Sequence, residues 1–129
     1  MKVITLIFIF LLSFLSIISF ATPTTHSIYI FDKKNFVISN LNIIGGNITI
    51  INSRNIIIKD NVISNSVYFG IFIYNSSNVT IIHNVISNAY YDGISIRESR
   101  NITIEFNTIA NNSNGNGISV WDYSSFVNI

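Results

Sequence analysis

Short apolar runs separated by polar turns fill most of this chain, and the same arrangement returns along it. Between Asn78 and Arg100 the apolar runs are Val79–Ile82, Val85–Ile86 and Ile94–Arg97. In the first and third runs apolar side chains occupy every second position, which is typical of a strand with one buried and one exposed face. Val, Ile and Thr dominate these runs, and their β-branched side chains favour extended backbone. No run is long enough for a helix, so three short strands are predicted.

Equivalent positions of this unit recur every 23 residues. This spacing separates Asn55, Asn78 and Asn101, and it separates Gly70 from Gly93. A fixed period of this length indicates a repeat architecture. Three strands per repeat can wind into a coil, with each strand parallel to its counterpart one turn below and about 4.8 Å away. The predicted fold is therefore an all-β, right-handed parallel β-helix of about four coils of about 23 residues.

Stacked coils place repeated residues in columns. Inward-facing Ile columns are expected at Ile48, Ile71, Ile94 and Ile118, and at Ile58, Ile81 and Ile104. Two ladders of Asn are expected at Asn55, Asn78 and Asn101, and at Asn61, Asn84 and Asn107. Asn tolerates left-handed backbone at a tight corner, and stacked Asn amides can hydrogen-bond to the copies above and below. Both ladders are thus interpreted as structural.

The first 21 residues differ from the repeats. Lys2 precedes an apolar run that ends at Ser19-Phe20-Ala21, a pattern typical of a secretory signal helix with a cleavage site. The alternative is an uncleaved anchor, because the run is about as long as a membrane-spanning helix. We therefore expect a signal peptide over 1–21, a linker over 22–27 and the β-helix over 28–129, in a protein that is secreted or held at the cell surface. Residues 1–21 are the only expected membrane contact.

The C-terminal end of the predicted β-helix has no polar capping segment. Phe126–Ile129 begins another strand, and solenoids need capped ends for solubility. Two explanations stay open: the sequence is truncated from a longer β-helix, or another β-helix chain stacks on this end.

Composition excludes several classes of site. The sequence has no Cys, so disulfide scaffolds and thiolate metal sites are excluded. Outside residues 1–21, six Lys and Arg balance six Asp and Glu, so no basic field exists to attract nucleic acid. His83 has no second His or Cys nearby and makes a weak metal site. No metal and no cofactor are predicted.

One repeat pattern carries a family resemblance. It is Gly-Ile-x-Ile-x-x-Ser-x-Asn-[Val/Ile]-Thr-Ile-x-x-Asn-x-Ile, as in Gly93–Ile109. It resembles the repeats of NosD-like accessory proteins of nitrous-oxide reductase and of the "carbohydrate-binding and sugar hydrolase" group, over residues 28–129. The resemblance implies the right-handed parallel β-helix. It leaves function open, because this group holds polysaccharide lyases, hydrolases, copper-maturation proteins, adhesins and surface-layer proteins.

The resemblance also points to a candidate ligand face. In β-helix enzymes of this kind, saccharide lies across the outer face of the Gly-Ile-x-Ile strands, where Phe72, Tyr74, Arg97 and Trp121 are expected. Their aromatic rings would stack on sugar rings, and Arg97 would hold a carboxylate or hydroxyl group. Cation–π contact of Arg97 with Tyr74 and Trp121 is expected. The alternatives are packing under a loop, cross-strand pairs that stiffen the sheet, or a protein contact.

Glu98 and Asp122 are the candidate catalytic residues. They fall at the same corner of adjacent coils, and two carboxylates about 5 Å apart could share a proton or bind a cation. The alternative is a pair of solvated corner carboxylates. The Asp-Asp and Gly-His-Gly motifs of polygalacturonases and the calcium-binding Asp clusters of pectate lyases are absent. Of five Asn-x-Ser/Thr sequons, Asn111 in an Asn- and Gly-rich loop is the glycosylation candidate.

The few ionisable groups favour a module without catalysis. The expected function is that of a secreted or cell-surface repeat module with a structural or binding role, with polysaccharide as the candidate ligand. Two alternatives stay open: a polysaccharide lyase or glycoside hydrolase, or a fragment of one, and a NosD-like accessory protein for metalloenzyme maturation.

Overall fold

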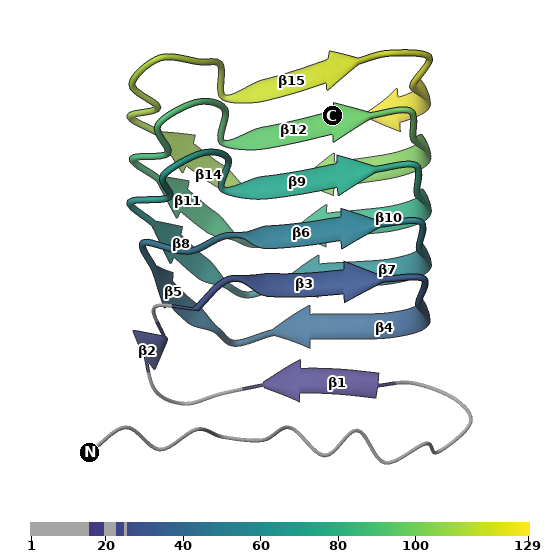
Figure 1. The fold of residues 1–129 in the computed structure, drawn as a ribbon, viewed down its shortest axis with the longest axis horizontal. Helices are drawn as coiled ribbons and strands as arrows, with labels where there is room; N and C mark the ends of the chain where they lie inside the picture. The colour runs from purple at the N-terminus through teal and green to yellow at the C-terminus, as the bar shows by residue number, and fades with distance from the viewer. Residues whose placement is uncertain (1–15, 20–22, 25) are drawn as a thin grey trace.

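The computed structural model describes residues 16–19, 23–24 and 26–129, and its strands form three parallel sheets (Figure 1). Sheet A consists of β1 (Ser16–Ser19), β4 (Lys34–Ser39), β7 (Arg54–Lys59), β10 (Ser77–Ile82), β13 (Arg100–Glu105) and β16 (Ser125–Asn128). Sheet B consists of β2 (Pro23–Thr24), β5 (Asn42–Ile44), β8 (Val62–Ser64), β11 (Val85–Ser87) and β14 (Thr108–Ala110). Sheet C consists of β3 (Ile28–Phe31), β6 (Ile48–Ile51), β9 (Ile71–Tyr74), β12 (Ile94–Arg97) and β15 (Ile118–Trp121).

Neighbouring strands in each sheet are parallel and come from successive coils. Figure 1 shows the coils stacked on one another, with sheet C facing the viewer. The predicted parallel β-helix is thereby confirmed. Strands β10, β11 and β12 begin and end within two residues of the three strands expected in the repeat unit.

The parallel sheets begin earlier than residue 28. Ser16 on β1 lies opposite Phe36 on β4, and β2 pairs with β5. These two strands fall within the segments expected to be signal peptide and linker, and cleavage after Ala21 would remove β1. The helix expected over 1–21 falls mostly outside the described residues and stays a prediction. No helix among the described residues is long and apolar enough to cross a membrane.

The core is built from the predicted Ile columns. Ile48, Ile71 and Ile94 are Cα partners in sheet C and are fully buried. Ile58 and Ile81 form the same arrangement in sheet A. Burying each such side chain contributes about 1.5–3 kcal/mol. No coil can hide its apolar face alone, so the stack is stabilised coil against coil.

Each full coil turns four corners through residues with positive φ. The four sets are Asp32, Asn52, Asn75, Glu98 and Asp122; Asn35, Asn55, Asn78, Asn101 and Phe126; Asn40, Asp60, His83 and Phe106; and Gly45, Asn65, Asn88 and Asn111. Asn and Asp adopt this conformation more readily than other non-glycine residues. The corners therefore account for much of the Asn in the sequence.

Both Asn ladders are confirmed. In the inner ladder Asn61 Nδ2 donates to Asn84 Oδ1 at 2.9 Å, and Asn84 Nδ2 donates to Asn107 Oδ1 at 3.0 Å. In the outer ladder Asn78 Nδ2 donates to Asn55 Oδ1 at 3.0 Å. The expectation of left-handed backbone is right for the outer ladder and wrong for the inner one. There the positive φ falls one residue earlier, which leaves the Asn side chain to point into the molecule.

Candidate functional site

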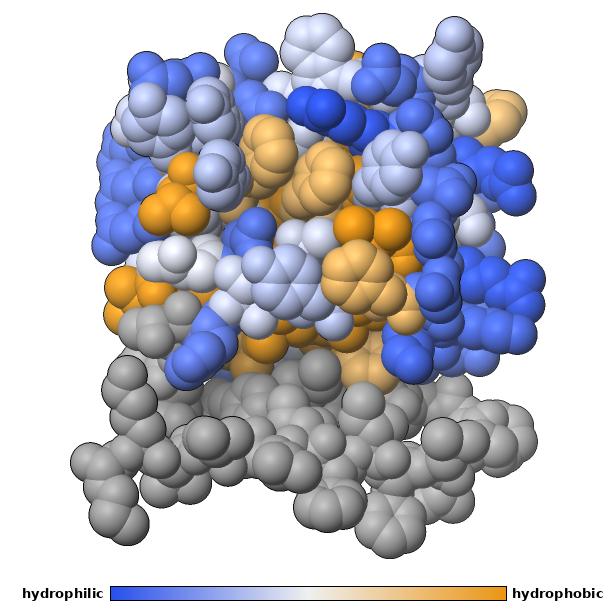
Figure 2. Space-filling view, viewed as in Figure 1, coloured by the Kyte–Doolittle hydropathy of each residue, from blue (hydrophilic) through white to orange (hydrophobic). Residues whose placement is uncertain are grey.

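Sheet C carries aromatic side chains on its outer face. Phe72 and Tyr74 on β9 stack with ring centroids 6.4 Å apart. The loop before β9 adds Phe69, 5.3 Å from Phe72, and the loop before β12 adds Tyr91, 6.1 Å from Phe69. We call these four residues the aromatic surface. Figure 2, which views sheet C, shows apolar side chains gathered near the middle of this face and polar ones along its sides.

Arg97 joins the aromatic surface from β12. Its Cα lies opposite Tyr74 on one side and Trp121 on the other, as the repeat predicts. Its guanidinium carbon, however, lies 5.9 Å from the ring centroids of both Phe69 and Phe72. The prediction of cation–π contacts with Tyr74 and Trp121 is therefore wrong, because the rings that Arg97 contacts are those of Phe69 and Phe72. The side chain lies towards the loop before β9 because that loop supplies a second ring beside Phe72.

Two polar atoms on β12 are buried without a hydrogen-bond partner. They are Arg97 Nε and Ser95 Oγ. Buried polar atoms are nearly always paired, and an unpaired one costs about 1–3 kcal/mol. The guanidinium of Arg97 therefore lies against two aromatic rings, with its buried Nε unpaired.

The four predicted ligand-face residues lie on neighbouring strands. Phe72 and Tyr74 are half-buried on β9, and Arg97 is half-buried on β12. Trp121 on β15 is 53% exposed. The structure therefore brings them onto one face, with flat rings available to a ligand and one cation between the strands.

The two candidate catalytic carboxylates occupy one corner of adjacent coils. The backbone N–H of Glu98 donates to the carbonyl oxygen of Asp122 at 2.8 Å, and both side chains are exposed. The Glu98 carboxylate raises the pKa of the Tyr74 phenol above its usual value of 10.0, first through its negative charge and then through a side-chain hydrogen bond. Desolvation and the charge of Asp122 add smaller effects. The charges of Glu98 and Asp122 therefore act on Tyr74, which is one of the predicted ligand-face residues.

Concave surface lies along this same corner, between sheets C and A. A hollow of about 240 Å³ beside Glu98 is lined by Asn75, Ser76, Ser77, Glu98, Ser99, Arg100, Tyr123 and Ser125. A second hollow of about 270 Å³ continues from Asn75 and Ser77 towards Lys34 and Arg54. Sequence reasoning did not single out Lys34, Arg54 or Arg100. The signal was available, because each of them begins a strand of sheet A, namely β4, β7 and β13.

Three buried serines, Ser53, Ser76 and Ser99, lie at this corner. Sequence reasoning did not single them out either. The backbone N–H of Ser53 donates to Ser76 Oγ, and that of Ser76 donates to Ser99 Oγ, both at 3.1 Å. Each hydroxyl in turn donates to a carbonyl two residues earlier, as Ser76 Oγ does to Tyr74 O at 2.8 Å. These serines are fully engaged in holding the turn and are structural.

Two further predicted positions lie away from sheet C. Asn111 is exposed at a corner with φ of 57°, so its side chain is accessible for the predicted glycosylation. His83 Nδ1 lies 3.9 Å from Asp60 Oδ1, and its ring lies 5.5 Å from that of Phe106. Among the described residues, no group of three or more His, Cys, Asp or Glu side chains is placed to hold a metal ion.

The comparisons with known proteins identify a family and nothing narrower. A family model described as "Right handed beta helix region" matches residues 15–129. The match includes β1 and β2, in agreement with the early start of the sheets. No curated protein and no solved structure matches the chain significantly.

Proposed function

Because the chain belongs to the right-handed β-helix family, we propose that it is a secreted or cell-surface binding module that holds polysaccharide against sheet C. The export part of this proposal is supported by the apolar N-terminal segment, which is typical of a signal peptide. The binding part is supported chiefly by one observation: stacked rings, an Arg guanidinium that lies against them and an exposed Trp share the outer face of three neighbouring strands.

The chemistry of this face suits sugars. Phe72 and Trp121 offer flat apolar surfaces, on which the C–H faces of sugar rings can pack. Arg97 offers donors in a rigid fork, a geometry that suits carboxylate oxygens and pairs of hydroxyls. Its contact with Phe69 and Phe72 fixes the guanidinium before any ligand arrives, so little side-chain entropy is lost on binding.

A glycan array on the purified protein tests the proposal, with Tyr74→Ala and Trp121→Ala as the site variants. We expect each to weaken binding about tenfold, as loss of one stacked ring costs about 1–2 kcal/mol at an interface. Phe106→Asn is the matched control, because Phe106 is 76% exposed at another corner with φ of 54°. Asn fits that backbone, so the control should keep both fold and binding.

Two results would count against this function. One is the absence of any saccharide ligand on the array. The other is binding that Tyr74→Ala and Trp121→Ala leave unchanged, which would assign the rings to packing or to a protein contact.

A polysaccharide lyase or hydrolase is the second candidate. It is favoured by the negative charge of Glu98, which raises the pKa of Tyr74, because this places an acid group at the edge of the ligand face. Turnover of uronate polymers by the wild type and by Glu98→Gln is the test. Catalysis by this pair requires the variant to lose nearly all turnover, and undiminished turnover would remove Glu98 from the mechanism.

A further inference from the structure

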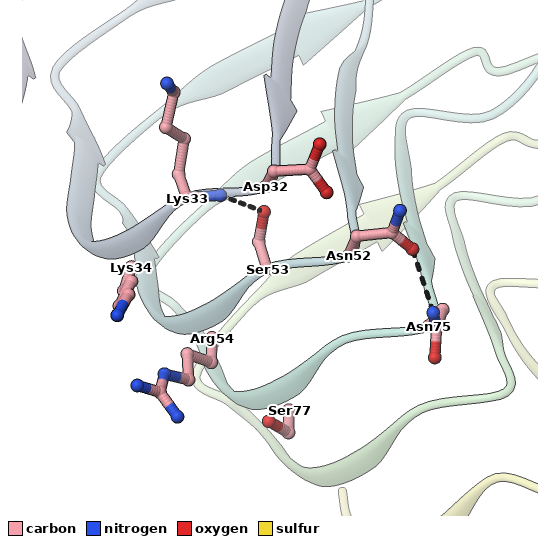
Figure 3. A pocket seen from close by; sticks show the side chains of 8 residues that line it. All are labelled: Asp32, Lys33, Lys34, Asn52, Ser53, Arg54, Asn75 and Ser77. Carbon is pink, nitrogen blue, oxygen red and sulfur yellow. Dashed lines mark hydrogen bonds between the residues drawn. The ribbon is translucent and has the colours of Figure 1, made fainter.

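A hollow of about 270 Å³ lies along the corner between sheets C and A, and its lining comes from three successive coils and includes no residue of the aromatic surface (Figure 3). This volume is close to the lower end of the range for small-molecule sites. In Figure 3, Lys34 and Arg54 lie on one side of the hollow, Asn52 and Asn75 on the other, and Ser53 between them. The remaining lining residues are Asp32, Lys33 and Ser77.

The hollow gathers positive charge. Lys33, Lys34 and Arg54 are opposed there by the single carboxylate of Asp32, which leaves a local net charge of +2. In the part of the chain that the structure describes, no carboxylate oxygen lies within 4.0 Å of a Lys or Arg nitrogen. The three cations are therefore not neutralised by ion pairs within those residues.

The repeat places two of these cations directly opposite one another. Lys34 and Arg54 are Cα partners at the start of β4 and β7. Like charges at opposed positions in a sheet destabilise it. The next strand has Ser77 at this position, and Arg100 follows one coil later. The juxtaposition of two cations thus occurs once in this column, at the hollow.

The frame around the hollow is fixed without using the cations. Ser53 Oγ accepts the backbone N–H of Lys33 at 3.1 Å and donates to Ile51 O at 2.8 Å. Asn75 Nδ2 donates to Asn52 Oδ1 at 2.8 Å. The Arg54 guanidinium and the Lys34 ammonium are left facing solvent beside a rigid floor.

We propose that this corner binds a tetrahedral oxyanion, that is, a sulfate or phosphate group, with Arg54 and Lys34 as its main ligands. The fork of Arg54 can donate two parallel hydrogen bonds to such a group, and Lys34 adds a point charge. The hollow has room for part of a molecule that carries the group as an ester. This site uses other residues than the sugar face, so it can be present whether or not sheet C binds polysaccharide.

Isothermal titration calorimetry on the full chain tests the site, at about 0.15 M ionic strength maintained with sodium chloride. The probes are inorganic sulfate, inorganic phosphate, glucose 6-sulfate and glucose 6-phosphate. The variants are Arg54→Gln and Lys34→Gln. Lys59→Gln is the matched control, because Lys59 is an exposed cation on the same strand whose Cα partners are Ser39 and Ile82.

We expect saturable binding of at least one probe, a loss of about tenfold in affinity for Arg54→Gln and Lys34→Gln, and no loss for Lys59→Gln. Tighter binding of an ester than of the bare ion would identify the carrier as a larger molecule, and the sulfate and phosphate arms would distinguish its chemistry. Without oxyanion, Arg54→Gln should unfold at the same or a higher urea concentration, since it removes a like-charge contact.

Three outcomes would overturn the proposal. No saturable binding above the chloride background is one. An equal loss in Lys59→Gln is the second, and it would mean an adventitious ion only. The third is a fall in urea resistance of Arg54→Gln without oxyanion, which would make Arg54 a structural residue.

Discussion

Replacing Asn84 by Ala tests the inner ladder, which lies at the centre of the stack. Asn84 is 1% exposed. Its Oδ1 accepts from both the backbone N–H and the Nδ2 of Asn61, at 3.0 and 2.9 Å. Its Nδ2 donates to Ile58 O, Ile82 O and Asn107 Oδ1 at 2.9 to 3.1 Å. The side chain therefore joins three successive coils.

The expected loss of stability follows from what Ala leaves behind. The backbone N–H of Asn61 loses its acceptor in a buried position, which costs about 1–3 kcal/mol. The other lost hydrogen bonds cost about 0.5–1.5 kcal/mol each where their groups keep another partner. Together these give a loss of about 3 kcal/mol or more. A domain has about 5–15 kcal/mol in total, so the variant should unfold readily.

Urea unfolding, followed by far-ultraviolet circular dichroism and by fluorescence of the single Trp, measures this loss. Asn78→Gly is the matched control in the same coil. Asn78 is exposed, takes part in two ladder hydrogen bonds and has φ of 53°, which Gly adopts without strain. The control should lose less than about 1 kcal/mol. A loss below about 1 kcal/mol in Asn84→Ala, or an equal loss in the control, would refute the reasoning from burial.

Two further predictions follow from close contacts in neighbouring coils. A Cβ at Gly93 would lie 2.3 Å from Ile109 Cγ2 and 2.7 Å from the carbonyl oxygen of Gly117, so Gly93→Ala should lower the free energy of unfolding in urea by about 1–3 kcal/mol. Gly117→Ala, whose Cβ would meet its nearest atom at 3.8 Å, should be near neutral, and equal losses would contradict the steric argument. Because Glu98 raises the pKa of Tyr74, the phenol should titrate above pH 10.0 in a spectrophotometric titration, and Glu98→Gln should lower that pKa; no change would show that the charge is not the cause. A raised folded pKa also means that this contribution to stability is present below about pH 10 and is lost as the pH rises through the folded pKa.

The fold could be predicted because two periods agree along the chain. Alternation every second residue chooses the inward face, and the 23-residue repeat fixes which residues stack. Ile71 and Ile94 show both, and the structure makes them buried Cα partners. The sequence predicted less well which residue at each corner has a positive φ. Position in the repeat says that a turn is present, but the choice between His83 and Asn84 for left-handed backbone depends on which side chain can reach the core carbonyls.

The candidate site was harder to predict, for two different physical reasons. The column that holds Arg97 follows from the repeat, but the direction of a long side chain depends on what its neighbours offer. Phe69 comes from a loop that the strand periodicity does not place, and it draws the guanidinium away from Trp121.

The basic hollow was missed because charge was summed over the whole chain. Six charges of each sign cancel in that sum, while the register puts Lys34 against Arg54 and leaves no carboxylate within ion-pair distance of either among the described residues. In a β-helix the inward positions are fixed by stacking, so residues that are free to serve a ligand gather outside and at corners. Charge in such a fold therefore has to be counted column by column, since a net charge of zero is compatible with a locally unbalanced corner.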